Sequence, residues 1–247
     1  MATADLRTSH RCSAEDRRQQ ILDTATDLFA RQGFGSTTTR QIAQEAHVNE
    51  ALIFRHFATK EDLYWAVLEH QCVAGGDGRR IMTEELARSG SPQESFAGIA
   101  RSFLQLRQQD SNLGRLLLFS ALEHHQLSQR FFRTHIAELY EKLAQHILEQ
   151  IGAGKFREVD PMLAARGFWG MVVYHFLVQE LLGGKQYQDI DTDEASRAIA
   201  DIWLNGMLPR TEPGEPDPGG SNGKGVRENR EKTLLPQRTQ KTRRHTE

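Results

Sequence analysis

Apolar residues along the chain recur at intervals of three and four positions, which is the spacing of one face of an α-helix. Early in the chain, Ile21, Leu22, Ala25, Leu28 and Phe29 form one such stripe. The period-two alternation of branched residues that marks half-buried strands is missing from the sequence. The pattern therefore predicts an all-α protein.

Short polar residues mark the starts of four helices in the first third of the chain. Each is a side chain that can accept a hydrogen bond from the first turn of a helix: Ser13, Thr38, Asn49 and Thr59. Gly33 is expected to end the first helix, and the turn 46–49 separates the second from the third. Two short helices joined by a tight turn predict a helix-turn-helix over residues 38–57.

The rest of the chain also carries helix signals. Glycines within 75–78 mark a break, and Ser91-Pro92-Gln93-Glu94 is a strong helix start. Later helices are expected at 112–125, 128–151, 161–183 and 192–208.

Three regions follow from this pattern: a helical domain at residues 15–75, a second helical domain at residues 76–209, and a C-terminal segment. Residues 210–247 are rich in Pro, Gly and charge, with few apolar residues, so they are expected to be a disordered tail.

Composition narrows the class of protein. A net charge of −2 leaves nucleic-acid binding to local placement of charge. The two cysteines, Cys12 and Cys72, have no metal-like spacing, and the N-terminus lacks the apolar run of a signal peptide. The most apolar stretch, 162–182, is interrupted by charged and polar residues, so a buried helix is favoured over a membrane span. A cytoplasmic protein is expected.

The third helix of the N-terminal region has two distinct sides. At 100° per residue, Ile53 and Phe57 face the core, whereas Ala51, Leu52 and Arg55 cluster on the opposite side. A small residue permits close approach to base edges, leucine suits thymine methyls, and arginine reaches guanine or phosphate. This layout is typical of a recognition helix.

Positions around this helix suit the DNA backbone. Thr38, Thr39 and Arg40 open the second helix, where hydroxyl and N–H groups favour a phosphate, and Lys60 adds a cation at the far edge. Phe54 and His56 flank the recognition side.

The segment RRQQILDTATDLFARQGFGSTTTRQIAQEAHVNEALIFRHFATKEDLYWAVLE resembles the N-terminal domain of tetracycline-repressor (TetR) family regulators. The resemblance implies phosphate contacts from Thr38, Thr39, His56 and Lys60. It also implies that a second set faces the major groove: Arg40, Glu50, Ala51, Leu52 and Arg55. With Asn49 and Phe54, these residues make up the expected DNA-binding site.

Three positions depart from the family pattern. His47 stands where glycine is usual in the turn, and histidine tolerates the left-handed region at some cost. Phe54 replaces the usual tyrosine, and Glu50 places a negative charge where a basic or neutral residue is common. Modest DNA affinity and an unusual half-site are expected.

The helix expected at 161–183 is apolar nearly all round and must be covered on every side. A four-helix contact between two subunits, made by 161–183 and 192–208, would supply that cover, and the resemblance implies the same interface. A two-fold homodimer matches double-stranded DNA with a palindromic operator.

The resemblance further implies a three-helix DNA-binding domain at residues 15–75 and a helical ligand-binding and dimerisation domain at residues 76–209. It also implies a repressor released by a small apolar or amphipathic effector. The expected pocket lies within residues 92–183, with this lining: Phe103, Leu106, Phe119, Leu122, Phe132, Tyr140, Trp169, Tyr174 and His175. No metal or cofactor is expected. A DNA-binding dimer without sensing, and an activator or dual regulator, remain alternatives. An enzyme is not favoured, because no nucleophile–base pairing or phosphate-binding loop after a strand is found.

Overall fold

A computed structural model describes residues 13–74, 78–88, 90–123 and 125–209. Every regular element in these ranges is helical, which confirms the all-α prediction. The expected tail at 210–247, and Cys12, lie outside the described residues.

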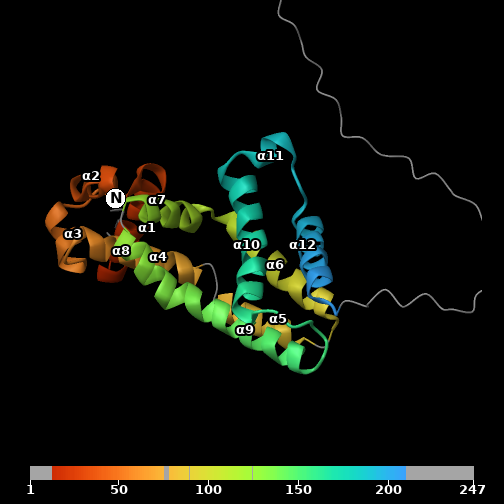
Figure 1. The fold of residues 1–247 in the computed structure, drawn as a ribbon. Coiled ribbons are helices and arrows are strands. Elements are labelled where there is room, and N and C mark those ends of the chain that lie inside the picture. The colour runs from red at the N-terminus through yellow and green to blue at the C-terminus, as the bar shows by residue number, and fades with distance from the viewer. Residues whose placement is uncertain (1–12, 75–77, 89, 124, 210–247) are drawn as a thin grey trace, which may run out of the picture. The chain divides into compact units, whose positions relative to one another are not determined.

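The N-terminal helices begin where their capping residues predict. In order they are α1 (Ala14–Ser36), α2 (Thr39–Glu45), α3 (Glu50–His56) and α4 (Lys60–Ala74) (Figure 1). The hydroxyl of Ser13 accepts from the backbone N–H of Asp16, and the Asp16 carboxylate accepts in return from the N–H of Ser13. Thr38 and Gln41 make the same reciprocal pair at α2.

The helices of the second half also start at predicted caps, including Ser91, Asp160 and Asp191. They are α5 (Gly78–Ala87), α6 (Pro92–Gln109), α7 (Asn112–Glu123), α8 (His125–Phe131), α9 (Ala137–Gly152), α10 (Pro161–Phe176), α11 (Gly184–Tyr187) and α12 (Thr192–Met207). The segments Phe132–Ile136 and Leu177–Leu181 are π-helical. The predicted helix 128–151 is thus α8 and α9 joined by a π-helical turn, and 161–183 is α10 with a π-helical end.

One hydrophobic core lies among the C-terminal helices. Its centre is an aromatic cluster in which the ring of Phe96 stacks on Trp203 at 4.4 Å and meets Phe168 edge-on at 5.1 Å. The indole N–H of Trp203 donates to the carbonyl of Ala164 at 3.1 Å, which fixes α12 against α10. Burial of large aromatic rings is strongly stabilising.

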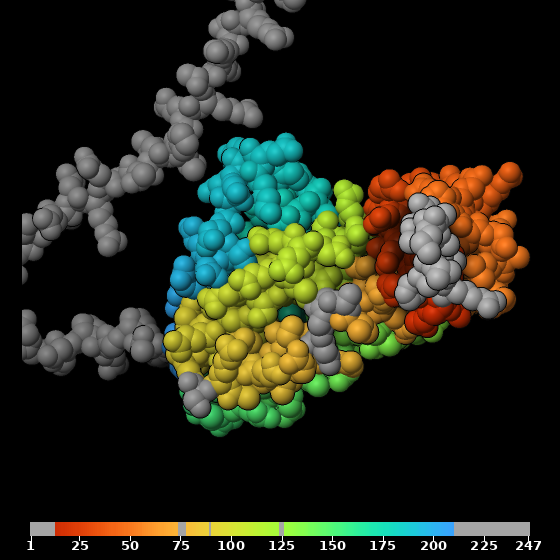
Figure 2. Space-filling view, turned by 180° about the vertical axis from the view of Figure 1, so that it is seen from behind, coloured from red at the N-terminus to blue at the C-terminus, as the bar shows by residue number. Residues whose placement is uncertain are grey.

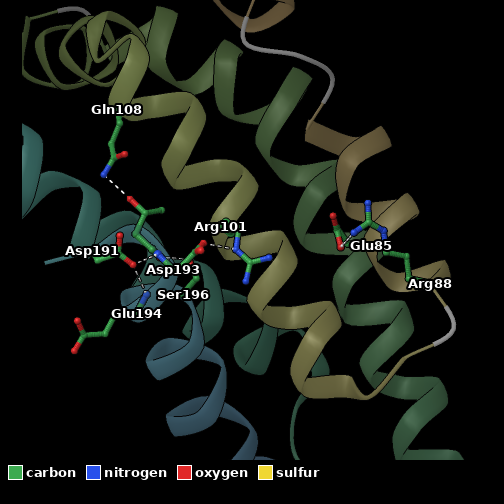
Figure 3. A network of polar contacts seen from close by, with 9 residues as sticks. Glu85, Arg88, Arg101, Gln108, Asp191, Asp193, Glu194 and Ser196 are labelled. Atoms are coloured by element: carbon green, nitrogen blue, oxygen red, sulfur yellow. Dashed lines mark hydrogen bonds and ion pairs between the residues drawn. The ribbon is translucent and has the colours of Figure 1, made fainter.

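Helix α6 lies at the centre of the C-terminal helices, where α5 and α12 both pack against it (Figure 2). Polar contacts at the surface set the register of α6 on α12 (Figure 3). The guanidinium Nε of Arg101 lies 2.6 Å from the carboxylate of Asp193, and the Gln108 amide donates to the Thr192 hydroxyl.

A second hydrophobic core lies among α1 to α4 and also includes residues of α7 and α8. Leu113 and Leu116 of α7 and Phe131 of α8 are buried in it. The hydroxyl of Tyr64 on α4 donates to the carbonyl of Leu116 at 2.6 Å, and burial raises the pKa of that phenol far above its usual value. Helices α7 and α8 are therefore bound to the N-terminal helices by shared packing.

Candidate nucleic-acid interface

The turn between α2 and α3 sets the direction of the third helix. His47 has a φ of 51°, so it adopts the left-handed conformation that the turn was expected to require. The N–H of Val48 donates to the carbonyl of Ala43 at 2.9 Å, and the side chain of Asn49 caps α3 through the N–H of Leu52. Asn49 is thereby placed as a helix cap at the edge of the expected DNA face.

The two sides of α3 are largely as predicted. Ile53 and Phe57 are buried in the N-terminal core, whereas Ala51 and Arg55 are exposed. Phe54, on the flank of the helix, is 48% exposed.

Two residues of the expected site lie between these sides. Leu52 is half-buried and packs against the N-terminal core, so only part of its side chain faces outward. His56 is half-buried as well, next to the ring of Phe57. The angular argument placed Leu52 opposite the core, but the side chain packs partly against it.

Glu50 and Thr39 form a contact that joins α3 to α2. The Thr39 hydroxyl donates to the Glu50 carboxylate at 2.5 Å. The hydroxyl expected to bind a phosphate is therefore already bonded, and the carboxylate expected to repel DNA is held at the junction of the two helices. The hydroxyl of Thr38 is likewise engaged, in the capping box with Gln41, whereas Arg40 is exposed.

Lys60 is directed toward the protein rather than toward solvent. Its ammonium donates to the carbonyls of Phe34 and Thr37, each at 2.8 Å, and lies 4.0 Å from the centre of the Phe34 ring. Partial burial lowers the pKa of Lys60. This geometry gives Lys60 the role of a cap for the carboxyl end of α1, which its sequence position did not reveal.

Helix α7 reaches the same end of α1. Gly33 interrupts α1 with a φ of 81°, and the N–H of Gly35 donates to the Glu123 carboxylate at 2.7 Å. A Cβ at Gly33 would collide with the side chains of Glu123 and Phe119. The last turn of α7 thus rests on the break in α1, a contact for which the sequence carries no local signal.

The residues expected to line a ligand pocket are only partly brought together. The rings of Phe103 and Trp169 meet edge-on at 5.5 Å, and Phe132 and Tyr140 do so at 6.0 Å. His175 borders a narrow cleft between α6 and the end of α10, and burial lowers its pKa. Leu106 and Phe119 are half-buried.

Two of the expected lining residues lie on the outside of the subunit. Leu122 is 85% exposed and Tyr174 is 67% exposed, so neither shares an interior pocket with Phe103 and Trp169. Helical spacing alone did not distinguish the interior face of α10 from its outer face, because both faces of that helix are apolar.

The outer face of α10 and its neighbour α12 is apolar and open. Large side chains there are exposed: Leu163 at 64%, Tyr174 at 67% and Ile202 at 63%. Gly167 and Gly170 on α10, and Gly206 on α12, leave open space beside them, with no atom within 4 Å of a Cβ built at each. We call these six residues the outer face.

The described residues offer no site for a metal ion and no membrane-spanning helix. In the described part of the chain, no group of three His, Cys, Asp or Glu side chains is placed to hold a metal ion. None of the described helices combines the length and apolar character needed to cross a bilayer.

Comparison with known proteins gives two family matches. Residues 21–67 match the model of bacterial regulatory proteins of the tetR family. Residues 94–205 match the C-terminal domain of AefR-like transcriptional repressors.

Characterised relatives match mainly over the first of these regions. An HTH-type transcriptional repressor of Mycobacterium tuberculosis is 50% identical over 56 residues, 23% of this chain and 30% of the relative. The match therefore spans less than a third of that protein. HTH-type transcriptional regulator RutR of Escherichia coli O157:H7 is 24% identical over 204 residues, 78% of this chain and 92% of the relative.

Solved structures resemble the whole helical arrangement. The transcriptional regulator FadR of Bacillus subtilis, solved in complex with stearoyl-CoA, superposes with a TM-score of 0.62 at 21% identity, covering 76% of this chain and 98% of that one. A fatty acid metabolism regulator of Clostridium perfringens gives 0.63 at 18% identity, covering 77% and 100%. Two consecutive family matches, a shared fold and the helix-turn-helix built by α2 and α3 agree: the chain belongs to the TetR family of bacterial regulators.

Proposed function

We propose that the chain is a sequence-specific DNA-binding transcriptional regulator that works as a homodimer and leaves a palindromic operator when a small ligand binds. The observation that carries the proposal is the orientation of α3. The helix is held by the core through Ile53 and Phe57 while Ala51 and Arg55 face outward. A small residue and an arginine on the open side of a fixed helix suit the major groove.

Exposed arginines supply the attraction to DNA. Arg40 opens α2, and Arg55 lies in the last turn of α3. Both are exposed, whereas Lys60 and the hydroxyls of Thr38 and Thr39 are engaged within the protein. Backbone contacts by Thr38, Thr39, His56 and Lys60 therefore require rearrangement or water, and the two arginines are the primary candidates.

The outer face supports dimerisation. Large exposed apolar residues alternate there with glycines, which lets two helices from different subunits approach closely. A two-fold contact through α10 and α12 buries this surface and presents two copies of α3 to one side of DNA.

The contact of α7 with α1 supplies a route from sensing to DNA binding. At its start, Gly114 of α7 lies against the ring of Phe176 on α10, so close that a Cβ would collide with that ring. At its end, Glu123 holds Gly35. A ligand that displaces α10 or α6 would tilt α7 and shift α1, and with it the spacing of the two recognition helices.

Binding to random-sequence DNA tests the proposal. The full chain is mixed with a duplex library, bound fragments are sequenced over several rounds, and the enriched site is protected from nuclease. An inverted repeat is expected, with half-sites about one helical turn apart. Arg55→Ala is expected to lose the preference at one base pair per half-site, while Arg80→Ala on α5 keeps it. A library without enrichment would refute the proposal.

Regulation by a ligand is tested on the selected site. In the B. subtilis neighbour the bound molecule is stearoyl-CoA, so amphipathic compounds are the first set to screen by thermal shift. A compound that stabilises the protein is expected to release it from the selected DNA. Stabilising compounds that leave the complex intact would favour a DNA-binding dimer without sensing.

A further inference from the structure

Glu50, the first residue of α3, uses only one of its two carboxylate oxygens within the protein. Its Oε1 accepts from the hydroxyl of Thr39 on α2 at 2.5 Å. No group of the described residues donates to its Oε2, and that oxygen is accessible to solvent. Glu50 itself is half-buried. The carboxylate is therefore held against α2 by one oxygen while the other remains a free acceptor.

The charge of this carboxylate is not neutralised within the protein. Among the described residues, no lysine, arginine or histidine forms an ion pair with Glu50. Arg40 and Arg55, the exposed arginines of the same two helices, also form no ion pair in the described ranges. A carboxylate repels phosphate, so the only DNA groups that Oε2 can bind favourably are hydrogen-bond donors on the bases.

Base edges in the major groove offer few donors. Cytosine and adenine each present an amine there, whereas guanine and thymine present only acceptors and, in thymine, a methyl group. Adenine also carries the acceptor N7 beside its amine, which repels a carboxylate, but cytosine has a donor and no acceptor. The first residues of a recognition helix contact base edges. An oxygen that can only accept, placed on the first residue of α3, therefore suits cytosine best.

We infer that Glu50 recognises one cytosine in each half-site, whose amine donates to Oε2, and that Thr39 is the positioning residue that holds the carboxylate through Oε1. This inference rests on the proposed function, because it names a base that α3 selects. Ala51, which follows Glu50 and is exposed, leaves room for the base edge to approach. The charge of Glu50 lowers affinity for DNA of any sequence and raises selectivity among sequences.

DNA selection with two proteins identifies the base pair concerned. The random-sequence library is bound to the full-length wild type and to Glu50→Ala, and the position whose preference differs is the candidate. Duplexes that carry each of the four bases at that position in both half-sites are then compared by fluorescence anisotropy. The wild type should bind the cytosine duplex about tenfold more tightly than the others, and Glu50→Ala should bind all of them within about twofold. The general effect of the charge on affinity is common to these duplexes and cancels in the ratio.

Glu50→Gln keeps the contact with Thr39 and decides the question if Glu50→Ala does not fold. Its amide carries a donor as well as an acceptor. Discrimination against guanine and thymine should therefore fall to about twofold, because their acceptors can now be bound. Glu84→Ala, on the exposed side of α5, is the control and should keep the preference of the wild type. Thermal melting shows whether each variant is folded at the temperature of the binding assay.

Substitutions of Thr39 test its positioning role. Thr39→Val keeps the shape of the side chain but removes the hydroxyl, so the preference for cytosine should fall about threefold. Thr39→Ser keeps a hydroxyl and should retain the preference. If Thr39→Val weakened binding to all four duplexes equally and left the ratio unchanged, Thr39 would contact phosphate rather than position Glu50.

Two outcomes overturn the recognition of cytosine by Glu50. One is a selected site with no cytosine whose preference depends on Glu50, and the other is a wild-type preference in Glu50→Ala or Glu50→Gln. Either result, obtained with a clearly enriched inverted repeat, refutes the cytosine contact alone and leaves the proposed regulator standing. A library without enrichment in the wild type refutes the proposed function and the cytosine contact together.

Discussion

At the scale of single residues, the contact between Thr39 and Glu50 changes the expected chemistry of the DNA face. A carboxylate at the start of a recognition helix would repel phosphate if it were free. Here it accepts a hydrogen bond from a hydroxyl of α2, so the same residue also fixes the angle between the two helices. A single substitution at Glu50 can remove the charge and keep the hydrogen bond.

Glu50→Gln keeps an acceptor for Thr39 and removes the charge. We expect the affinity for DNA to rise about fivefold at low salt, which corresponds to about 1 kcal/mol for one charge near a phosphate. The gain should shrink as salt rises, because screening weakens it. Fluorescence anisotropy across a salt series measures both effects.

Glu84→Gln, on the exposed side of α5, is the matched control and should leave the affinity unchanged. Equal affinities of Glu50→Gln and the wild type at all salt concentrations would show that Glu50 does not face DNA.

Lys60→Met tests whether Lys60 stabilises the carboxyl end of α1. The methionine keeps the apolar stem over Phe34 but removes donors from two carbonyls. We expect the free energy of unfolding to fall by about 1–3 kcal/mol, measured by urea denaturation. Lys155→Met, exposed after α9, should change it by less than about 0.5 kcal/mol. If Lys60→Met were as stable as the wild type but bound DNA poorly, Lys60 would contact the DNA backbone as the sequence predicted.

At the scale of elements, α1 is shaped by the break at Gly33. A φ of 81° is open to glycine and strained for other residues. The break turns the last residues of the helix so that the N–H of Gly35 points at Glu123. Helices α1 and α7 are therefore joined at a place where a side chain could not fit.

Gly33→Ala should be strongly destabilising. The alanine would need an unfavourable backbone conformation, and its Cβ would collide with Phe119 and Glu123. We expect a loss of about 2–4 kcal/mol in the free energy of unfolding, from backbone strain plus overpacking. Thermal denaturation followed by circular dichroism gives the value.

Gly152→Ala provides the comparison, because nothing lies within 4 Å of a Cβ there and the residue ends α9. It should be neutral or slightly stabilising. If Gly33→Ala melted as the wild type does, α1 and α7 would have to be less tightly joined than described.

The sequence predicted local features well and distant contacts poorly. Caps such as Ser13, Thr38 and Asn49 were predicted correctly because each satisfies backbone groups within three residues. The contacts of Lys60 with two carbonyls were not predicted, because these partners lie 23 and 26 residues away in the sequence. Glu123 was missed for the same reason, at a separation of 88 residues.

It was likewise easier to predict that a segment is helical than to predict which of its faces is buried. Helix α10 is apolar on all sides, so periodicity could not tell that Trp169 points inward and Tyr174 outward. The π-helical turns at 132–136 and 177–181 could not be predicted from the spacing of apolar residues. Helix α5 was not predicted either, because only the glycine-containing break before it was recognised.

At the scale of the whole molecule, the outer face predicts the assembly. Ile202→Glu places a charge at its centre, and a charge buried between two copies of the same residue is costly. We expect the variant to sediment as a monomer and to lose affinity for the selected operator, because each half-site then binds alone.

Leu148→Glu, on the exposed side of α9, changes the same residue class outside this face. It should remain a dimer and bind DNA normally. Sedimentation of Ile202→Glu as a dimer would place the subunit contact elsewhere.

The histidines predict how stability depends on pH. Burial lowers the pKa of His135, His146 and His175 below the usual 6.5. The unfolded chain then binds protons more readily than the folded one below pH 6.5, so stability is complete above that value and decreases as the pH falls. Melting temperatures at pH 7.5, 6.5 and 5.5 should decline in that order.

His146→Gln should make this decline shallower, since the residue that packs near Phe96 no longer titrates. Identical melting temperatures at the three pH values would show that these histidines are protonated as easily in the folded protein as in the unfolded one.

The shared packing of α7 and α8 with the N-terminal helices also matters for protein engineering. The family match to the N-terminal domain ends within α4, at residue 67, so the end of α4 is an obvious place to cut out the DNA-binding module. In this chain such a cut would strip Leu113, Leu116 and Phe131 from the module and open its interior to water. A transplant that carries residues 112–131 along as a spliced insert should stay soluble and retain its operator, whereas one ending at α4 should aggregate.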